Sequence, residues 1–510
     1  MGTAQKESLT EEFIKNSFWS LLLSILTKVG GFLFTLILAR FLMPEGFGVY
    51  SFILAIAMIF MAFGDLGINQ TLIILLSKNR DNENKSRAYL KFLQKIKLIL
   101  LIIISLVFVI GAYFISATYL SDYNPLVLII LCSAYIFFFS LSGFFVSFFY
   151  IYRKIKLDFF KELIFQIVRF SIILIIFIFF SKEFYIVGVF LTLAISSAAM
   201  FVYSYFQSKK ISPSLHASEH YDSIDKKRIS KMLFYFMIGT LSLLLFSEVD
   251  ILMIGLLIKD LIYVGYYRAY FAIILGVTGI ISFSSLLLPI FSSFDSSQLK
   301  NAFNKVSRYT LMLAVPACFG LLALGSYFIK FFYGADYVPG AFILYFLSFL
   351  VISESLTGLF NTVISSRERP RFIAISLIIS IAINMILAYF LITLLYPRSV
   401  VLGISGAAIA TLVSRYFFMF CLWIYSRKHF KISLLVKDII KPLISSLVMF
   451  AILLFISRNI EMNILFGVIL IVIGALIYFM MMVLLKGIVA EDRMVLDIVY
   501  KKMKNVFWRK

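Results

Sequence analysis

Four basic residues lie inside long apolar stretches of the chain, where a charged side chain has no water around it: Lys28, Arg169, Arg268 and Arg415. A charge at the centre of a bilayer costs about 2.5–3.5 kcal/mol on insertion scales, so such residues are expected to face a cavity or a partner. A guanidinium suits bidentate contacts to phosphate, and a Lys ammonium acts as a point charge. We therefore predict that the four cations line a cavity and hold an anionic (pyro)phosphate group.

The same cations have a structural interpretation that the sequence leaves open. Each could pair with a carboxylate inside the membrane, or extend its side chain to the membrane surface. Arg169 has such a partner nearby, because Glu162 precedes it by seven residues and lies on the same face of a helix.

Four carboxylates also lie inside apolar stretches: Asp65, Glu248, Asp250 and Glu354. A carboxylate removed from water tends to take up a proton or bind a cation. These residues are therefore candidates for coupling movement of a substrate to a gradient of H⁺ or Na⁺. The alternative is structural, with each carboxylate in an ion pair or in hydrogen bonds at a helix end.

Gly30 and Gly31 follow Lys28 in the first apolar stretch. A helix bends most easily at glycine, so we interpret this pair as a candidate hinge.

Motifs for other chemistry are absent from the sequence. There is no GxxxxGK[ST], GxSxG or HExxH motif, and the three cysteines and three histidines lack the spacing of a metal site. We predict no catalytic residue, no bound metal and no cofactor beyond a coupling ion, and hence a protein that is not an enzyme.

Helices that cross a membrane must position these residues. The mean hydropathy is +1.01 and 62% of the residues are hydrophobic, which excludes an ordinary soluble domain. Apolar stretches long enough to span a bilayer occur fourteen times, and backbone polar groups in lipid require helices. The predicted class is an all-α polytopic membrane protein with spans at 17–39, 47–76, 98–118, 124–150, 160–181, 184–207, 232–257, 261–292, 309–329, 338–364, 372–396, 400–425, 439–457 and 463–485.

The connections between these stretches alternate between rich and poor in Lys and Arg. The rich set holds 37 basic residues and the poor set 6. Because basic loops are retained on the cytoplasmic side, both termini are predicted to be cytoplasmic, in a multi-pass protein of the inner or plasma membrane. The net charge of +21 is explained by these loops and by contact with anionic membrane lipid, so nucleic acid is not an expected partner.

The chain divides at its longest hydrophilic stretch. We predict a six-helix lobe at 1–207, a cytoplasmic linker at 208–231, a second six-helix lobe at 232–430, a helix pair at 431–486 and a cytoplasmic tail at 487–510. Two pairs of similar segments support a duplication, since Gly48 and Gly265 are 217 residues apart and Gly188 and Gly406 are 218 apart. An even number of spans in each lobe predicts parallel halves related by an axis along the membrane normal, with a substrate cavity between them.

Six segments carry a family resemblance. They are ARFLMPEGFGVYSF (39–52), FGDLGINQTLI (63–73), FSEVDILMIGLLIKDLIYVGYYRAY (246–270), FYGADYVPGAFILYFLS (332–348), GISGAAIATLVSR (403–415) and GIVAEDRMVL (487–496). Together with the fourteen spans, they resemble the multidrug/oligosaccharidyl-lipid/polysaccharide flippase superfamily. Within it, the sequence is most similar to the polysaccharide transporter or O-antigen flippase branch.

The resemblance implies a function. It implies a flippase that moves polyprenyl-(pyro)phosphate-linked oligosaccharide from the cytoplasmic to the outer leaflet by alternating access, for surface polysaccharide or glycan assembly. A glycan polymerase or glycosyltransferases of the same pathway are possible partners. It also implies that Asp250 is the carboxylate best explained structurally, because the family often carries an Asp in this stretch. Two alternatives stay open: a lipid II flippase or multidrug exporter of the same fold, and a multi-span glycan polymerase or ligase.

Overall fold

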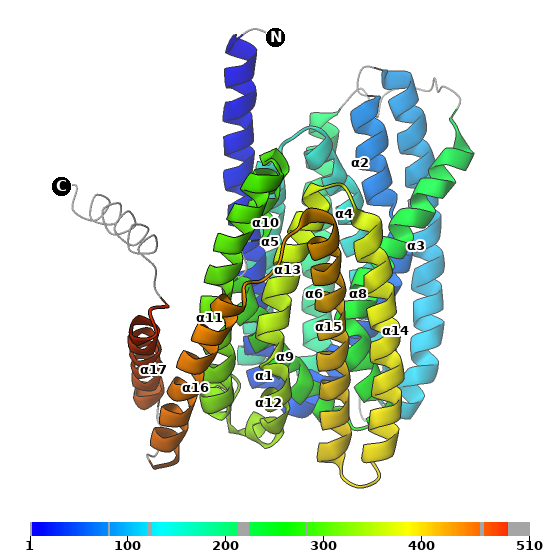
Figure 1. Cartoon of the computed structure of the whole chain (residues 1–510). Helices are drawn as coiled ribbons and strands as arrows, with labels where there is room; N and C mark the ends of the chain where they lie inside the picture. The colour runs from blue at the N-terminus through cyan, green and yellow to red at the C-terminus, as the bar shows by residue number, and fades with distance from the viewer. Residues whose placement is uncertain are drawn as a thin grey trace, which may run out of the picture. The chain divides into compact units, whose positions relative to one another are not determined.

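The computed structural model describes residues 3–79, 82–119, 125–212, 224–281, 284–459 and 464–487 (Figure 1). Every regular element in these ranges is a helix, which confirms the predicted all-α polytopic class. Most of the tail predicted at 487–510 and residues 213–223 of the predicted linker lie outside the described residues.

Thirteen helical segments among the described residues are long and apolar enough to cross a membrane. Each predicted span overlaps one of these segments, and the first segment, Lys15–Lys78, contains two of them. This segment has 64 residues. At about 1.5 Å per residue it is far longer than a hydrocarbon core of about 30 Å, which explains why one segment covers two predicted crossings. The total of fourteen spans stays a prediction.

A break inside the first helix separates these two crossings. Helix α1 runs from Thr3 to Asp65 and is interrupted at Met43, which has φ 59° and ψ 174°. Pro44 follows and begins the second arm, a position where its missing N–H and fixed φ are tolerated. The second crossing then continues through α2 (Ile68–Lys78) after Gly67, whose φ of +71° suits glycine.

The chain forms two compact units, each described here by itself. The first comprises Met1–Ala269 and Ile381–Ala407. Its helices, besides α1, α2 and parts of α9, α14 and α15, are α3 (Glu83–Tyr119), α4 (Pro125–Ile151), α5 (Ile155–Phe179), η1 (Lys182–Phe184), α6 (Tyr185–Ile211) and α8 (Lys226–Ile258). Within it, α4 packs on α6 and α3, and α1 packs on α5 and α8.

The second unit comprises Tyr270–Ser380 and Ala408–Lys510. Here α11 packs on α16 and α13, and α16 packs on α17. The limits of the two units do not coincide with the predicted lobes, whose boundaries stay a prediction. The remaining helices are α9 (Ile262–Ile281), α10 (Ser284–Ser293), α11 (Ser296–Phe332), η2 (Ala335–Gly340), α12 (Phe342–Leu347), α13 (Leu350–Ser366), α14 (Pro370–Leu395), α15 (Val400–Phe430), α16 (Val436–Asn459) and α17 (Ile464–Leu484).

The two glycines that mark the repeat lie against each other in the first unit. A Cβ on Gly48, in the second arm of α1, would lie 1.7 Å from the carbonyl oxygen of Leu261, just before α9. A Cβ on Gly265 would lie 2.0 Å from the carbonyl oxygen of Pro44. Residues 44 and 261 have the same offset as 48 and 265, so the contact is reciprocal. Equivalent segments that exchange equivalent contacts are expected around a local two-fold axis, in agreement with a duplication.

Contacts between helix ends follow the predicted sidedness. The Arg367 guanidinium donates to the carbonyl of Phe294 at 2.9 Å, and both residues lie in Lys/Arg-rich connections. At Lys/Arg-poor ends, the Tyr327 hydroxyl donates to the carbonyl of Ser457 at 3.1 Å. Both contacts join ends that the loop charges assign to the same side of the membrane.

Candidate functional site

Two of the predicted cations form ion pairs with two of the predicted carboxylates. In the first unit, Arg268 on α9 donates to Glu248 on α8 at 2.9 Å. In the second unit, Arg415 on α15 donates to Glu354 on α13 at 3.1 Å, with its guanidinium 5.6 Å from the ring of Phe271. For these four residues the structure therefore shows the paired arrangement that the sequence left open.

A third pair involves a cation that sequence reasoning missed. Lys97 on α3 donates to Asp65 at the end of α1, at 3.0 Å, and the Lys97 side chain is only 1% exposed. The predicted span began at residue 98, so Lys97 was assigned to a loop, whereas α3 begins at Glu83. Asp65 gave the only available signal, because a carboxylate deep in a span requires a partner.

Asp250, the fourth predicted carboxylate, is hydrogen-bonded to an amide side chain. It lies on α8, is buried, and accepts a hydrogen bond from the side-chain amide of Asn384 on α14 at 2.8 Å. Asn384 also lies in the first unit. This hydrogen bond stabilises the buried carboxylate.

Arg169 on α5 is a buried guanidinium without an ion pair in the described part of the chain. Three Phe rings surround it, with centroids 4.4, 5.0 and 5.5 Å from its Cζ atom. Its Nε and one Nη atom are buried and have no hydrogen-bond partner. Stacking on rings favours a cation electrostatically but leaves its in-plane N–H donors unsatisfied.

The expected partner of Arg169 is engaged elsewhere. Glu162 accepts a hydrogen bond from Gln166 at 2.7 Å and lies 3.5 Å from the Lys161 ammonium. Glu162 therefore forms no ion pair with Arg169.

A buried tyrosine, Tyr50, lies in the second arm of α1, in the same unit as Arg169 and the Arg268–Glu248 pair. Its ring lies 5.9 Å from the ring of Phe47 and 5.9 Å from that of Phe190.

Lys28 is exposed on the first arm of α1 and forms no hydrogen bond or ion pair with any described residue.

The two candidate hinge glycines near Lys28 have different surroundings. A Cβ on Gly30 would meet the Gln166 side chain at 2.5 Å, whereas one on Gly31 would meet nothing within 4 Å. Helix α1 runs unbroken through both glycines and departs from helical geometry only at Met43.

Among the described residues no three His, Cys, Asp or Glu side chains group as metal ligands.

The four predicted cations divide into two kinds. Arg268 and Arg415 are ion-paired, whereas Lys28 and Arg169 form no ion pair with a described residue.

Comparison with known proteins places this arrangement in a family. The sequence profile of the polysaccharide biosynthesis protein family matches residues 13–295, more than half of the chain. The chain belongs to this family. No curated protein matches the chain.

Solved structures share the fold of this polysaccharide biosynthesis protein. The lipid II flippase MurJ, in an inward closed conformation, superposes with a TM-score of 0.70 at 19% identity, over 93% of this chain and 99% of MurJ. A multidrug resistance MATE family transporter of the MOP superfamily gives 0.60 at 12% identity, over 80% and 94%. A MOP superfamily transporter from Pyrococcus furiosus gives 0.52 at 14% identity, over 81% and 95%. These structures show that the chain shares their fold, and the thirteen described segments long and apolar enough to cross a membrane confirm the predicted multi-pass membrane class.

Proposed function

We propose that this protein is a flippase that moves polyprenyl-(pyro)phosphate-linked oligosaccharide from the cytoplasmic to the outer leaflet of the inner or plasma membrane. Its family is named for polysaccharide biosynthesis, and its fold is shared with a lipid II flippase. In this proposal the charged head of the substrate crosses between the helices by alternating access while the lipid tail stays in the bilayer. Glycosyltransferases or a glycan polymerase of the same pathway would supply or consume the substrate.

The observation that carries the proposal is the state of Arg169. Its buried Nε and one buried Nη atom have no acceptor, and its charge has no paired carboxylate, among the described residues. A planar guanidinium fits the oxygens of a phosphate in a bidentate arrangement. Lys28, exposed and without an ion pair, supplies a second positive charge in the same unit. Arg268 and Arg415 would then keep the helices in register, or release their carboxylates when substrate arrives.

For ion coupling we propose Asp250. Asp65, Glu248 and Glu354 are each within 3.1 Å of a Lys or Arg nitrogen, so coupling through any of them would require its ion pair to open. Asp250 is buried and accepts a hydrogen bond from the Asn384 amide, and a buried carboxylate tends to take up H⁺ or bind a cation such as Na⁺. Asp250→Asn should abolish the dependence of transport on an imposed ion gradient. If the gradient still accelerates transport by this variant as in the wild type, Asp250 is not the coupling residue.

The hinge at Gly30 and Gly31 stays a proposal as well. Replacing both with Ala should slow transport and leave membrane insertion intact. Unchanged transport would place the flexible part of α1 elsewhere, for which the break at Met43 is the obvious position.

Reconstituted vesicles test the function itself. Fluorescent lipid-linked oligosaccharide would be incorporated with the purified protein, and a leaflet-selective reagent would report how much of the lipid reaches the other leaflet. We expect the reagent to reach a larger share of the lipid when the protein is present. The proposal is wrong if accessibility equals that of protein-free vesicles.

The same assay separates the alternatives. Lipid II moving faster than other lipid-linked saccharides would identify the first alternative cargo. Accumulation of cationic drugs would identify an exporter, although the two unpaired cations disfavour a cationic cargo. New glycosidic bonds in the recovered lipid would identify a polymerase or ligase.

A further inference from the structure

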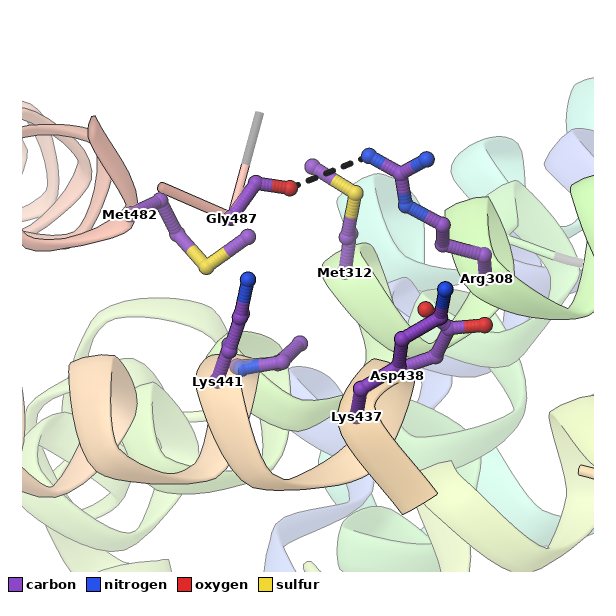
Figure 2. A pocket seen from close by; sticks show the side chains of 8 residues that line it. Arg308, Met312, Lys437, Asp438, Lys441, Met482 and Gly487 are labelled. Atoms are coloured by element: carbon purple, nitrogen blue, oxygen red, sulfur yellow. Dashed lines mark hydrogen bonds between the residues drawn. The ribbon is translucent and has the colours of Figure 1, made fainter. Parts of the chain in front are cut away.

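A small basic pocket lies in the second unit, where α11, α16 and the end of α17 meet (Figure 2). Its volume is about 100 Å³, enough for one phosphate group but too small for a sugar chain. Three cations and one carboxylate line it together with the side chains of two methionines. These residues are Arg308, Met312, Lys437, Asp438, Lys441 and Met482.

Two of the cations are held in place by the chain that follows α17. Arg308 donates to the carbonyl of Gly487 at 3.0 Å, as Figure 2 shows, and Lys441 donates to the carbonyl of Lys486 at 2.8 Å. Each contact uses one N–H donor of a group that carries several, because an ammonium has three N–H donors and a guanidinium five. The two basic groups therefore have fixed positions before any ligand arrives.

The third cation, Lys437, is not held by a hydrogen bond of this kind. Lys437 is exposed at the first turn of α16 and makes no hydrogen bond or ion pair with any described residue. Asp438 beside it offsets only part of the positive charge, so the pocket carries an excess of two charges. A structural role alone accounts for Arg308 and Lys441 but not for Lys437.

The surroundings of the pocket indicate where its ligand comes from. All of its segments belong to the Lys/Arg-rich ends of the helices, which the loop charges assign to the cytoplasmic surface. Exposed apolar side chains adjoin it on both helices of the pair: Leu443 and Ile444 on α16, and Val483 and Leu484 on α17. Basic groups at the rim next to a lipid-facing apolar surface match an anionic headgroup with its acyl chains alongside.

We propose that this pocket binds the phosphate of an anionic phospholipid of the cytoplasmic leaflet. The lipid would join the helix pair α16–α17 to α11, with its phosphate among Arg308, Lys437 and Lys441. This proposal is independent of the transported substrate, since every group involved lies in the second unit and none is among the cations assigned to transport.

Lipid binding to the full-length protein tests the proposal directly. Purified protein in a neutral detergent would be titrated with phosphatidylglycerol, phosphatidylcholine or inorganic phosphate, and bound lipid would be counted by native mass spectrometry. We expect phosphatidylglycerol to bind more tightly than phosphatidylcholine. Lys437→Gln should weaken phosphatidylglycerol binding about fivefold, the loss expected for one basic residue near an anionic surface.

A matched control uses the same charge change outside the pocket. Lys300 is exposed on α11, two turns before Arg308, so Lys300→Gln should bind phosphatidylglycerol as the wild type does. Because Lys437 makes no hydrogen bond or ion pair with a described residue, its variant should also keep the thermal stability of the lipid-free protein. Equal binding by Lys437→Gln and wild type, or equal loss in both variants, would overturn the proposal. Displacement of the lipid by millimolar inorganic phosphate would assign the pocket to a soluble anion and overturn its assignment to lipid.

Discussion

The reciprocal glycine contact makes a sharp prediction about stability. In Gly48→Ala the new methyl carbon would start 1.7 Å from the carbonyl oxygen of Leu261. Carbon–oxygen contacts across packed helices are usually about 3.3–3.6 Å, so the two backbones must separate by roughly 1.5 Å. A backbone carbonyl cannot move away from the new methyl group as easily as the end of a flexible side chain could. Overpacking of this kind typically costs about 1–3 kcal/mol, and Gly265→Ala should cost a similar amount because its methyl carbon would start 2.0 Å from the carbonyl oxygen of Pro44.

The stability losses caused by Gly48→Ala and Gly265→Ala should not be additive. Once the first alanine has forced the helices apart, most of the room for the second is already present. The double variant should therefore lose clearly less stability than the sum of the single variants, as expected for sites that share one backbone shift.

Chemical denaturation of the purified protein in detergent, followed by fluorescence, measures these differences. Controls are Gly239→Ala and Gly320→Ala, since a Cβ at either position meets nothing within 4 Å. Both controls should be neutral or up to about 1 kcal/mol more stable, because Ala is favoured over Gly inside a helix. Wild-type stability in Gly48→Ala, or strict additivity in the double variant, would refute the reciprocal contact.

Three further predictions concern charged residues. Glu354→Ala should destabilise the protein by about 3–5 kcal/mol because it removes the carboxylate that is ion-paired with the buried Arg415, and adding Arg415→Met should restore most of that loss in the same denaturation assay. Lys97→Met should likewise be rescued by Asp65→Asn; a double variant no more stable than Lys97→Met would show that the two residues do not act as a pair. Asp295 caps α11, and hydrogen bonds from the backbone N–H of Gln298 and from the Ser297 side chain lower its pKa, so its contribution should be present at neutral pH and be lost as pH falls below about 4. Asp295→Ala should remove that pH dependence from the denaturation midpoint.

Hydropathy and loop charge predicted the helical class, because lipid imposes one solution on the backbone, and each span that they predicted overlaps a described helical segment long and apolar enough to cross a membrane. They could not predict the helix ends, since a helix continues past the bilayer wherever packing supports it. Helix α3 begins fifteen residues before its predicted span, and for this reason Lys97 was assigned to a loop. The predicted span at 338–364 is likewise divided into η2, α12 and α13.

The sequence singled out most of the charged residues inside the spans, though not Lys97, but it could not predict how they pair. Lys28, Arg169, Arg268 and Arg415 were found because charge is rare inside a membrane. Which carboxylate each would meet depends on packing between helices that are distant in sequence, such as α13 and α15 for the pair formed by Arg415. One local prediction also depended on packing, because Glu162 has the right spacing for Arg169 but is bound by Gln166.

The internal repeat was visible in the sequence, where Gly48 and Gly265 lie 217 residues apart in similar segments. Spacing alone could not show that the two copies touch at those glycines, because similarity between segments carries no information on their contact. The reciprocal approach of Gly48 and Gly265 therefore adds a physical reason for the absence of side chains at both positions.

The role of Arg169 is tested most directly by comparing two substrates in the reconstituted flipping assay. One is lipid-linked oligosaccharide with its pyrophosphate, and the other is the same lipid and sugar joined by an uncharged linkage. Loss of charge-assisted hydrogen bonds worth about 1.5–3 kcal/mol predicts that Arg169→Gln slows the pyrophosphate substrate by about 10–100-fold and leaves the uncharged one nearly unchanged. Arg169→Lys, which keeps the charge, should fall between wild type and Arg169→Gln. Equal slowing of both substrates, or no slowing of either, would contradict the claim that this unpaired guanidinium holds the phosphate during transport.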